Sequence, residues 1–90
     1  MTADQFFQQN LLYSTEFSKY VLEHPEVESQ IPEGAQIFFL AENDPELSKE
    51  NLEMAEKMKA RHQPVVLVHV KGLRAESSRL IEPHLEVSAA

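Results

Sequence analysis

Four charged side chains follow two apolar segments of this chain and together suit a small charged ligand or a cation. They are Glu42, Asp44, Lys71 and Arg74. The first two come after the apolar run 35–41, and the other two come after the apolar run 65–70. If both runs are parallel strands, all four lie at the carboxyl end of the sheet, where open parallel sheets bind ligands. The alternative is that Asp44 caps a helix and the remaining charges form surface ion pairs.

Residue types that support covalent or metal chemistry do not form a recognisable set in this sequence. There is no cysteine, which excludes disulfides, thiolate metal ligands and thiol nucleophiles. The serines lack a GxSxG elbow, and the four histidines lack metal-ligand spacing. His69, inside the second apolar run, is expected to be a buried structural histidine. We therefore predict no catalytic residue, no cofactor and no metal.

The charge distribution disfavours nucleic acid and anionic membranes as partners. The net charge is −7, and residues 1–45 carry eight acidic residues against Lys19 alone. The basic residues of the second half are divided, because a strand of about 20 Å separates Arg61 from Lys71. No aromatic residue lies among them for base stacking.

The charged residues are positioned by a strand, a helix and a second strand. The runs 35–41 and 65–70 are continuously apolar, which is typical of strands covered on both faces. Asp44 and Pro45 begin a helix that extends to about Ala60. A strand, helix and strand with short loops predict two adjacent parallel strands joined by a right-handed crossover. The inward stripe of the helix is Leu47, Asn51, Met54, Ala55 and Met58.

The C-terminal tail contains a candidate for a third strand at the edge of the sheet. Pro83 interrupts it, and proline within sheets is confined to edges. The apolar residues of this candidate are Leu80, Ile81, Leu85 and Val87.

A helix over residues 3–23 is the candidate to cover the other face of the sheet. Pro25 ends it, because the residue before a proline is pushed out of the helical region. Its apolar face is wider than one packing contact needs, which predicts self-association as a homodimer. The expected interface residues are Phe6, Leu12, Tyr13, Phe17 and Tyr20. The alternative is that the C-terminal tail folds back and covers the surplus.

These elements predict a single small α/β (or α+β) domain over residues 1–90. A chain of 90 residues with 42% hydrophobic residues suits one domain. No apolar run approaches the roughly 20 residues of a membrane helix, and the N-terminus lacks the features of a signal peptide. Because so short a chain has no disulfide, we expect a cytoplasmic protein.

A string of short segments runs along nearly the whole chain. The segments are 16–26, Ile31-Pro32-Glu33-Gly34-Ala35, Asp44-Pro45-Glu46-Leu47, Pro64-Val65-Val66-Leu67-Val68 and Ser78-Arg79-Leu80-Ile81-Glu82-Pro83. This string resembles a family of small prokaryotic domains of unknown function. The resemblance implies a bacterial or archaeal cytoplasmic setting and brings no activity, cofactor or catalytic residue with it.

The leading interpretation is a non-enzymatic protein interaction module that forms a homodimer or one subunit of a larger assembly. Its support is the wide aromatic helix face, the charge asymmetry and the lack of a catalytic set. The first alternative is a small-ligand or metal-binding domain that uses the four charged side chains. The second is a nucleic-acid-associated regulator similar to an antitoxin.

Overall fold

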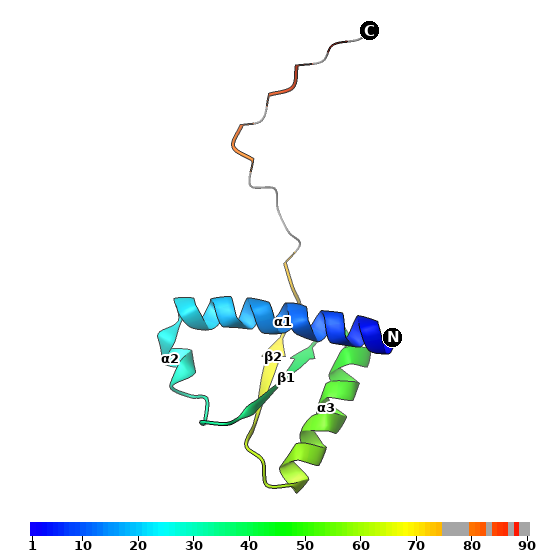
Figure 1. The fold of residues 1–90 in the computed structure, drawn as a ribbon, viewed down its shortest axis with the longest axis vertical. Helices are drawn as coiled ribbons and strands as arrows, with labels where there is room; N and C mark the ends of the chain where they lie inside the picture. Colours follow the sequence, from blue (N-terminus) through cyan, green and yellow to red (C-terminus); the bar gives the residue numbers. More distant parts are fainter. Residues whose placement is uncertain (75–79, 83, 87, 89–90) are drawn as a thin grey trace.

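The computed structural model describes residues 1–74, 80–82, 84–86 and 88. Two N-terminal helices precede a strand–helix–strand unit (Figure 1). The elements are α1 Ala3–Glu23, α2 Pro25–Glu28, β1 Gln36–Ala41, α3 Pro45–Ala60 and β2 Val65–Val70. In the described ranges, none of the helices combines the length and the hydropathy that crossing a bilayer requires.

The two strands form the predicted parallel pair. Residues 36–41 of β1 lie opposite residues 65–70 of β2 in continuous register. The N–H groups of Gln36 and Glu42 donate to backbone carbonyls on the β2 side at 2.9 and 3.0 Å. Because backbone groups alternate in direction along a strand, the intervening odd-numbered residues turn their N–H and C=O groups to the opposite edge. These residues are Ile37, Phe39 and Ala41.

Local sequence signals set both ends of helix α1. The Thr2 hydroxyl accepts the Gln5 N–H at 3.1 Å, and the Gln5 side chain accepts the Thr2 N–H at 2.9 Å. This reciprocal capping box satisfies two backbone donors that would otherwise lack a partner. Only His24 separates α1 from α2, and Pro25 follows it. The predicted end of the helix before Pro25 is therefore confirmed.

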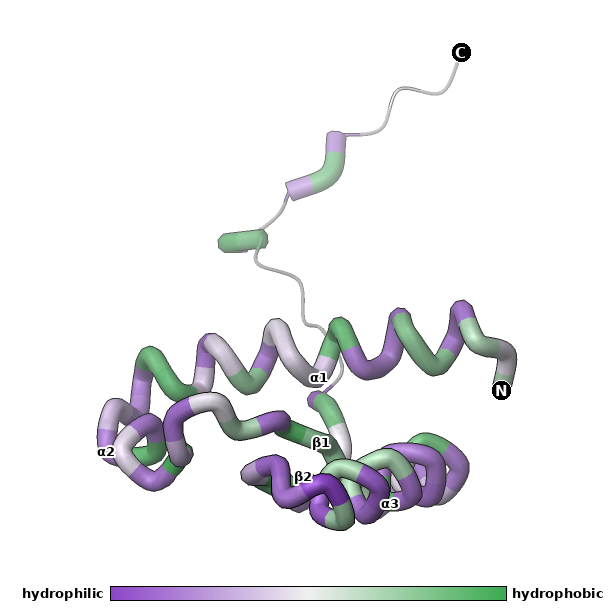
Figure 2. The backbone as a smooth tube through the Cα atoms, turned by 60° about the horizontal axis from the view of Figure 1, so that its bottom comes forward, coloured by the Kyte–Doolittle hydropathy of each residue, from purple (hydrophilic) through white to green (hydrophobic). Residues whose placement is uncertain are grey.

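The core lies between α1 and the sheet, which α1 crosses on one side (Figure 2). The Phe39 ring stacks on Tyr13 with 5.7 Å between centroids. It also meets Phe17 edge-on at 5.8 Å. Such aromatic pairs contribute about 0.5–1.5 kcal/mol beyond the area that they bury. Ala41 and Leu47 complete the buried cluster, so one strand residue, Phe39, anchors α1 to β1.

Helix α3 packs chiefly against β1 and buries a narrower stripe than the sequence predicts. Leu47, Asn51 and Ala55 are buried as expected, but Met54 is 43% exposed. Met58 is only half-buried. The reason is that α3 lies beside the free edge of β1, where its polar side chains bond to the strand backbone, and contacts β2 much less.

Two expectations about β2 and the tail are wrong in the described residues. His69 is exposed, because nothing covers that position of β2, and most other residues of the strand are half-buried. Among residues 80–82 and 84–86 there is no strand, and Leu80, Ile81 and Leu85 are 74%, 91% and 77% exposed. These residues lie on the side of α1 away from the sheet (Figure 1), so they do not extend its edge. Pro83 and Val87 lie outside the described residues.

The buried amide of Asn51 links α3, β1 and α1. Its side chain is 2% exposed and donates to the Phe39 backbone carbonyl at 2.9 Å. It also exchanges hydrogen bonds with the Asn10 amide of α1, at 2.9 and 3.3 Å.

We expect Asn51→Ala to lower the free energy of unfolding by about 1–3 kcal/mol, because it leaves buried acceptors without a donor. Urea denaturation measures this change. Asn10→Ala is the matched control and should cost less, because the bond from Asn51 to Phe39 remains. Equal losses in the two variants would contradict the central place given to the bond with the strand.

Candidate functional site

A cleft of about 630 Å³ lies between α1, β2 and the segment that follows β2. Phe17, Val68 and Leu73 contribute apolar wall to it and are half-buried. The exposed cations Lys71 and Arg74 lie along the same cleft. Since Glu16, the acid on the α1 side, pairs with Lys19 at 3.0 Å, the charge offered by the cleft is positive. We call this cavity the β2 cleft.

The four charged residues predicted as one ligand site are divided between two surfaces. Lys71 and Arg74 line the β2 cleft, whereas Asp44 lines a separate polar cavity of about 540 Å³. Glu42 is exposed and lines neither of these cavities. The reason for the division is local, since the Asp44 carboxylate accepts the Leu47 N–H at 3.2 Å and caps α3.

The loops that carry these residues do meet at one end of the sheet, as expected. Gly72 has a φ of +154° and lies so close to Asn43 that an added Cβ would stand 2.4 Å from the Asn43 amide nitrogen. The positive φ favours glycine at this position, whereas the crowding is with the end of the flexible Asn43 side chain, which can move aside. The prediction of a shared end is right for the backbone, while the side chains turn to different sides.

The acidic cavity at the start of α3 is electrostatically distinct from the β2 cleft. It is lined by Asp4, Asp44 and Glu46 together with glutamines of α1. The Met1 amino group forms an ion pair with Glu46, and this hydrogen bond and charge raise the pKa of the amino group. In the described part of the chain, no three His, Asp or Glu side chains are grouped so that they could hold a metal ion.

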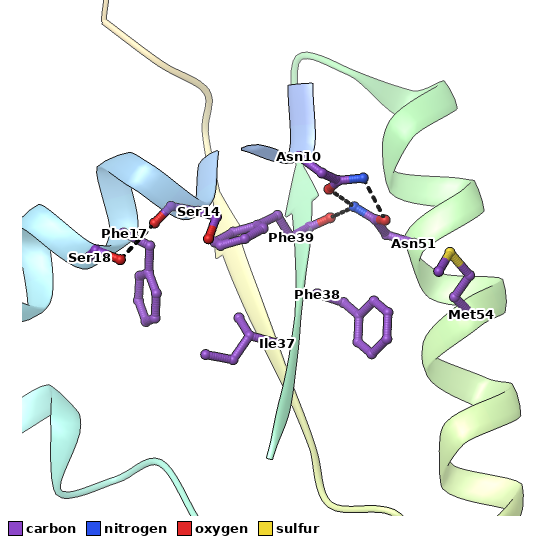
Figure 3. A pocket seen from close by; sticks show the side chains of 9 residues that line it. All are labelled: Asn10, Ser14, Phe17, Ser18, Ile37, Phe38, Phe39, Asn51 and Met54. Atoms are coloured by element: carbon purple, nitrogen blue, oxygen red, sulfur yellow. Dashed lines mark hydrogen bonds between the residues drawn. The ribbon is translucent and has the colours of Figure 1, made fainter. Parts of the chain in front are cut away.

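A third cavity, of about 310 Å³, lies beside the free edge of β1 between α1 and α3 (Figure 3). Ile37 and Phe38 of β1 and Met54 of α3 line it together with side chains of α1, namely Asn10, Ser14, Phe17 and Ser18. Polar side chains of α3 occupy much of the edge above it. The Ala41 N–H donates to the Ser48 hydroxyl, which donates back to the Ala41 carbonyl, both at 2.8 Å.

The residues predicted as an interface are split between the core and the surface. Tyr13 is 4% exposed and belongs to the core, while Phe6 and Phe17 are half-buried against it. Leu12 is 42% exposed, and Tyr20 is 49% exposed with its ring stacked on His24 at 4.1 Å. Of the five, only Leu12 and Tyr20 are therefore well placed for an outside partner.

Three residues that the interface prediction left out form the exposed apolar stripe of α1. Phe7, Leu11 and Leu22 are 61%, 50% and 83% exposed. They follow one another at spacings of four and eleven residues, which places them on one side of a helix. That spacing was the available signal, but periodicity alone does not say which half of a wide apolar face meets the sheet. We call Phe7, Leu11 and Leu22, with Thr15 between them, the outer stripe; Ser14 and Ser18 border it on the side of the cavity beside β1.

The family comparison agrees with the resemblance seen in the sequence. A model of a family of unknown function (DUF5647) matches residues 5–84. The chain belongs to the DUF5647 family. Neither the curated proteins nor the solved structures that were compared give a match. The DUF5647 match extends from the first turn of α1 past β2 into the tail, so the tail residues up to 84 share in the family pattern.

Asp44 is expected to act mainly through its cap. Asp44→Ala should lower the free energy of unfolding by about 0.5–2 kcal/mol, because the Leu47 N–H then loses its acceptor. Asp44→Asn and Asp44→Ser keep an acceptor and should cost little. Thermal or urea denaturation of the three variants measures the difference. An Asp44→Asn protein as unstable as Asp44→Ala would show that charge, not capping, is what matters there.

Tyr13 should make stability fall at alkaline pH. Burial of the phenol, with the nearby Asp44 charge, raises the pKa of Tyr13 above its ordinary value of 10.0. The folded state therefore holds this proton more tightly than the unfolded state. Its contribution is intact below pH 10 and is lost as the pH rises toward the folded pKa. Unfolding curves against pH should show a smaller alkaline loss for Tyr13→Phe, and an unchanged alkaline loss would contradict the assignment.

Proposed function

We propose that this protein is a non-enzymatic interaction module that forms a homodimer through the outer stripe of α1. The observation that carries the proposal is the exposure of Phe7, Leu11 and Leu22 on a helix whose other side already packs on the sheet. Phe7 and Leu11 lie one turn apart, and Leu22 lies about three turns further along the same side. Exposed apolar surface on one side of a small domain marks a contact site. Two-fold dimers are the commonest closed assembly of identical chains.

The polar atoms of the outer stripe favour its burial. The Thr15 hydroxyl donates to the Leu11 carbonyl at 2.9 Å. At the border of the stripe, the Ser18 hydroxyl donates to the Ser14 carbonyl at 3.0 Å. Both hydroxyls thus have partners within their own helix and lose little when water is removed. The stripe also contains no charged residue, so its centre pairs with itself without bringing like charges together.

The order of residues along the stripe suits an antiparallel pair of α1 helices. With the two-fold axis between Ser14 and Thr15, Phe7 faces Leu22 of the partner subunit and Leu11 faces the partner's Ser18. Small residues then lie at the centre, where the two helices come closest, and large apolar residues lie toward both ends. Leu12 and Lys19 flank this contact, which leaves the Lys19 charge at a solvated rim.

The alternative functions have less support from the described residues. A joint ligand site would need Asp44 beside Lys71 and Arg74, but the carboxylate is committed to the cap of α3. A nucleic-acid surface would need one basic patch, whereas β2 lies between Arg61 and Lys71. The proposal sets the dimer in the prokaryotic cytoplasm, where a small chain without cysteine needs no disulfide.

Leu11→Glu should convert the dimer to a monomer at micromolar concentration. Two-fold symmetry would place two unpaired carboxylates in the apolar contact, and desolvating them is costly. Sedimentation velocity or light scattering measures the mass. The helix content should not change, because Leu11 is half exposed in the single chain.

Gln8→Glu is the matched control for Leu11→Glu. It adds the same charge to the same helix at an exposed position outside the outer stripe, so the protein should remain dimeric. A wild-type protein that is monomeric at high micromolar concentration would refute the proposal. So would a Leu11→Glu protein that stays as dimeric as the control.

A further inference from the structure

The C-terminal arm, defined here as residues 80–82 and 84–86, presents apolar and acidic side chains to solvent. Ile81 is 91% exposed, and Leu80 and Leu85 are 74% and 77% exposed. Glu82 directly follows Ile81, Glu86 directly follows Leu85, and both acids are also exposed. A segment of this composition suits a groove that combines an apolar wall with positive charge.

The β2 cleft has these two properties. Phe17, Val68 and Leu73 provide apolar wall, and Lys71 and Arg74 provide positive charge along it. The other two cavities fit the arm less well. The cavity beside β1 is lined by no charged residue, and the cavity at the start of α3 is lined by Asp4, Asp44 and Glu46. Charge complementarity therefore selects the β2 cleft among the three.

The direction of the arm indicates that the cleft belongs to another copy of the chain. In both views the arm lies on the far side of α1 from its own sheet (Figures 1 and 2). That is the side on which a second copy would sit if it docked on the outer stripe.

We propose that the arm of each protomer docks into the β2 cleft of its partner, so that the dimer is closed by reciprocal exchange of the two arms. Ile81 and Leu85 cover the apolar wall, and Glu82 and Glu86 approach the partner's Lys71 and the partner's Arg74. The proposal rests on the self-association proposed above and adds a second, separate contact to it. From Arg74 to Ile81, seven residues span up to about 24 Å when extended, which allows the arm to pass α1. The extension of the family match to residue 84 is consistent with a role for the arm.

Engineered disulfides test this exchange directly, because the protein has no cysteine of its own. One chain carries Tyr20→Cys, at an exposed position of α1 that lines the β2 cleft, and another carries Ile81→Cys. The two full-length proteins are mixed, allowed to exchange subunits and oxidised. We expect a mixed disulfide dimer on a non-reducing gel, identified by mass spectrometry. Gln63→Cys, exposed at the far end of β2 from the cleft, replaces Tyr20→Cys as the control and should give several-fold less product.

Charge reversal shows whether the basic residues hold the arm. Arg74→Glu in the Tyr20→Cys chain should reduce the yield of the mixed disulfide. Glu82→Arg in the Ile81→Cys chain should restore it. If neither substitution changes the yield of the mixed disulfide, the electrostatic part of the proposal is overturned.

The outcomes separate this proposal from the dimer through α1. A wild-type protein that sediments as a dimer, with no more mixed disulfide than the Gln63→Cys control, overturns arm exchange and leaves the outer stripe contact standing. A chain carrying both Tyr20→Cys and Ile81→Cys that forms only an internal disulfide also overturns exchange, because the arm then occupies its own cleft. A monomeric wild-type protein overturns both.

Discussion

The hydrogen bonds of the buried Asn51 amide are the interaction on which the rest of this small fold depends. A two-stranded sheet is marginal by itself, because each strand keeps one open edge with backbone groups that need partners. Asn51 satisfies the carbonyl of Phe39 on the open edge of β1, and Ser48, one turn earlier on α3, satisfies both backbone groups of Ala41. Side chains of helix α3 thus bond to the β1 backbone groups that a third strand would pair with in a larger sheet. Through Asn10, the same amide also fixes α1 to this edge.

Because α1 is held in this orientation, only some of its side chains remain exposed to solvent. Tyr13 and Phe17 contact Phe39 on the inner side, and Asn10 is held at the β1 edge. The outer stripe consequently points away from the sheet, and it is apolar because α1 has more hydrophobic residues than one contact covers. The core of this domain is small, with few fully buried side chains, so a partner surface adds burial that the single chain lacks.

Electrostatics divides the remaining surface into regions with different roles. The acids at the start of α3 serve the helix cap and the Met1 ion pair, which leaves the cations after β2 without a fixed acidic partner in the described residues. Lys71 and Arg74 therefore make the β2 cleft positively charged. The outer stripe and the β2 cleft lie on different sides of α1, so the two proposed contacts use separate residues.

The sequence by itself determined the elements and their order, because that information is local. Pro25 ended α1, Asp44 and Pro45 began α3, and the continuous apolar runs fixed two parallel strands. The two loops also met at one end, as parallel pairing requires. What only the tertiary structure decided was the direction of each side chain. Tyr13 proved to be a core residue and Phe7 an exposed one, although both belong to one wide apolar face. Asp44 turned to its helix while Lys71 turned to the cleft, because a carboxylate at an N-cap satisfies backbone donors that a shared site would leave unpaired. Helical periodicity gives the angle between two side chains around the helix axis. It does not say which side of the helix faces the sheet, because that depends on contacts distant in the sequence, such as that between Asn10 and Asn51.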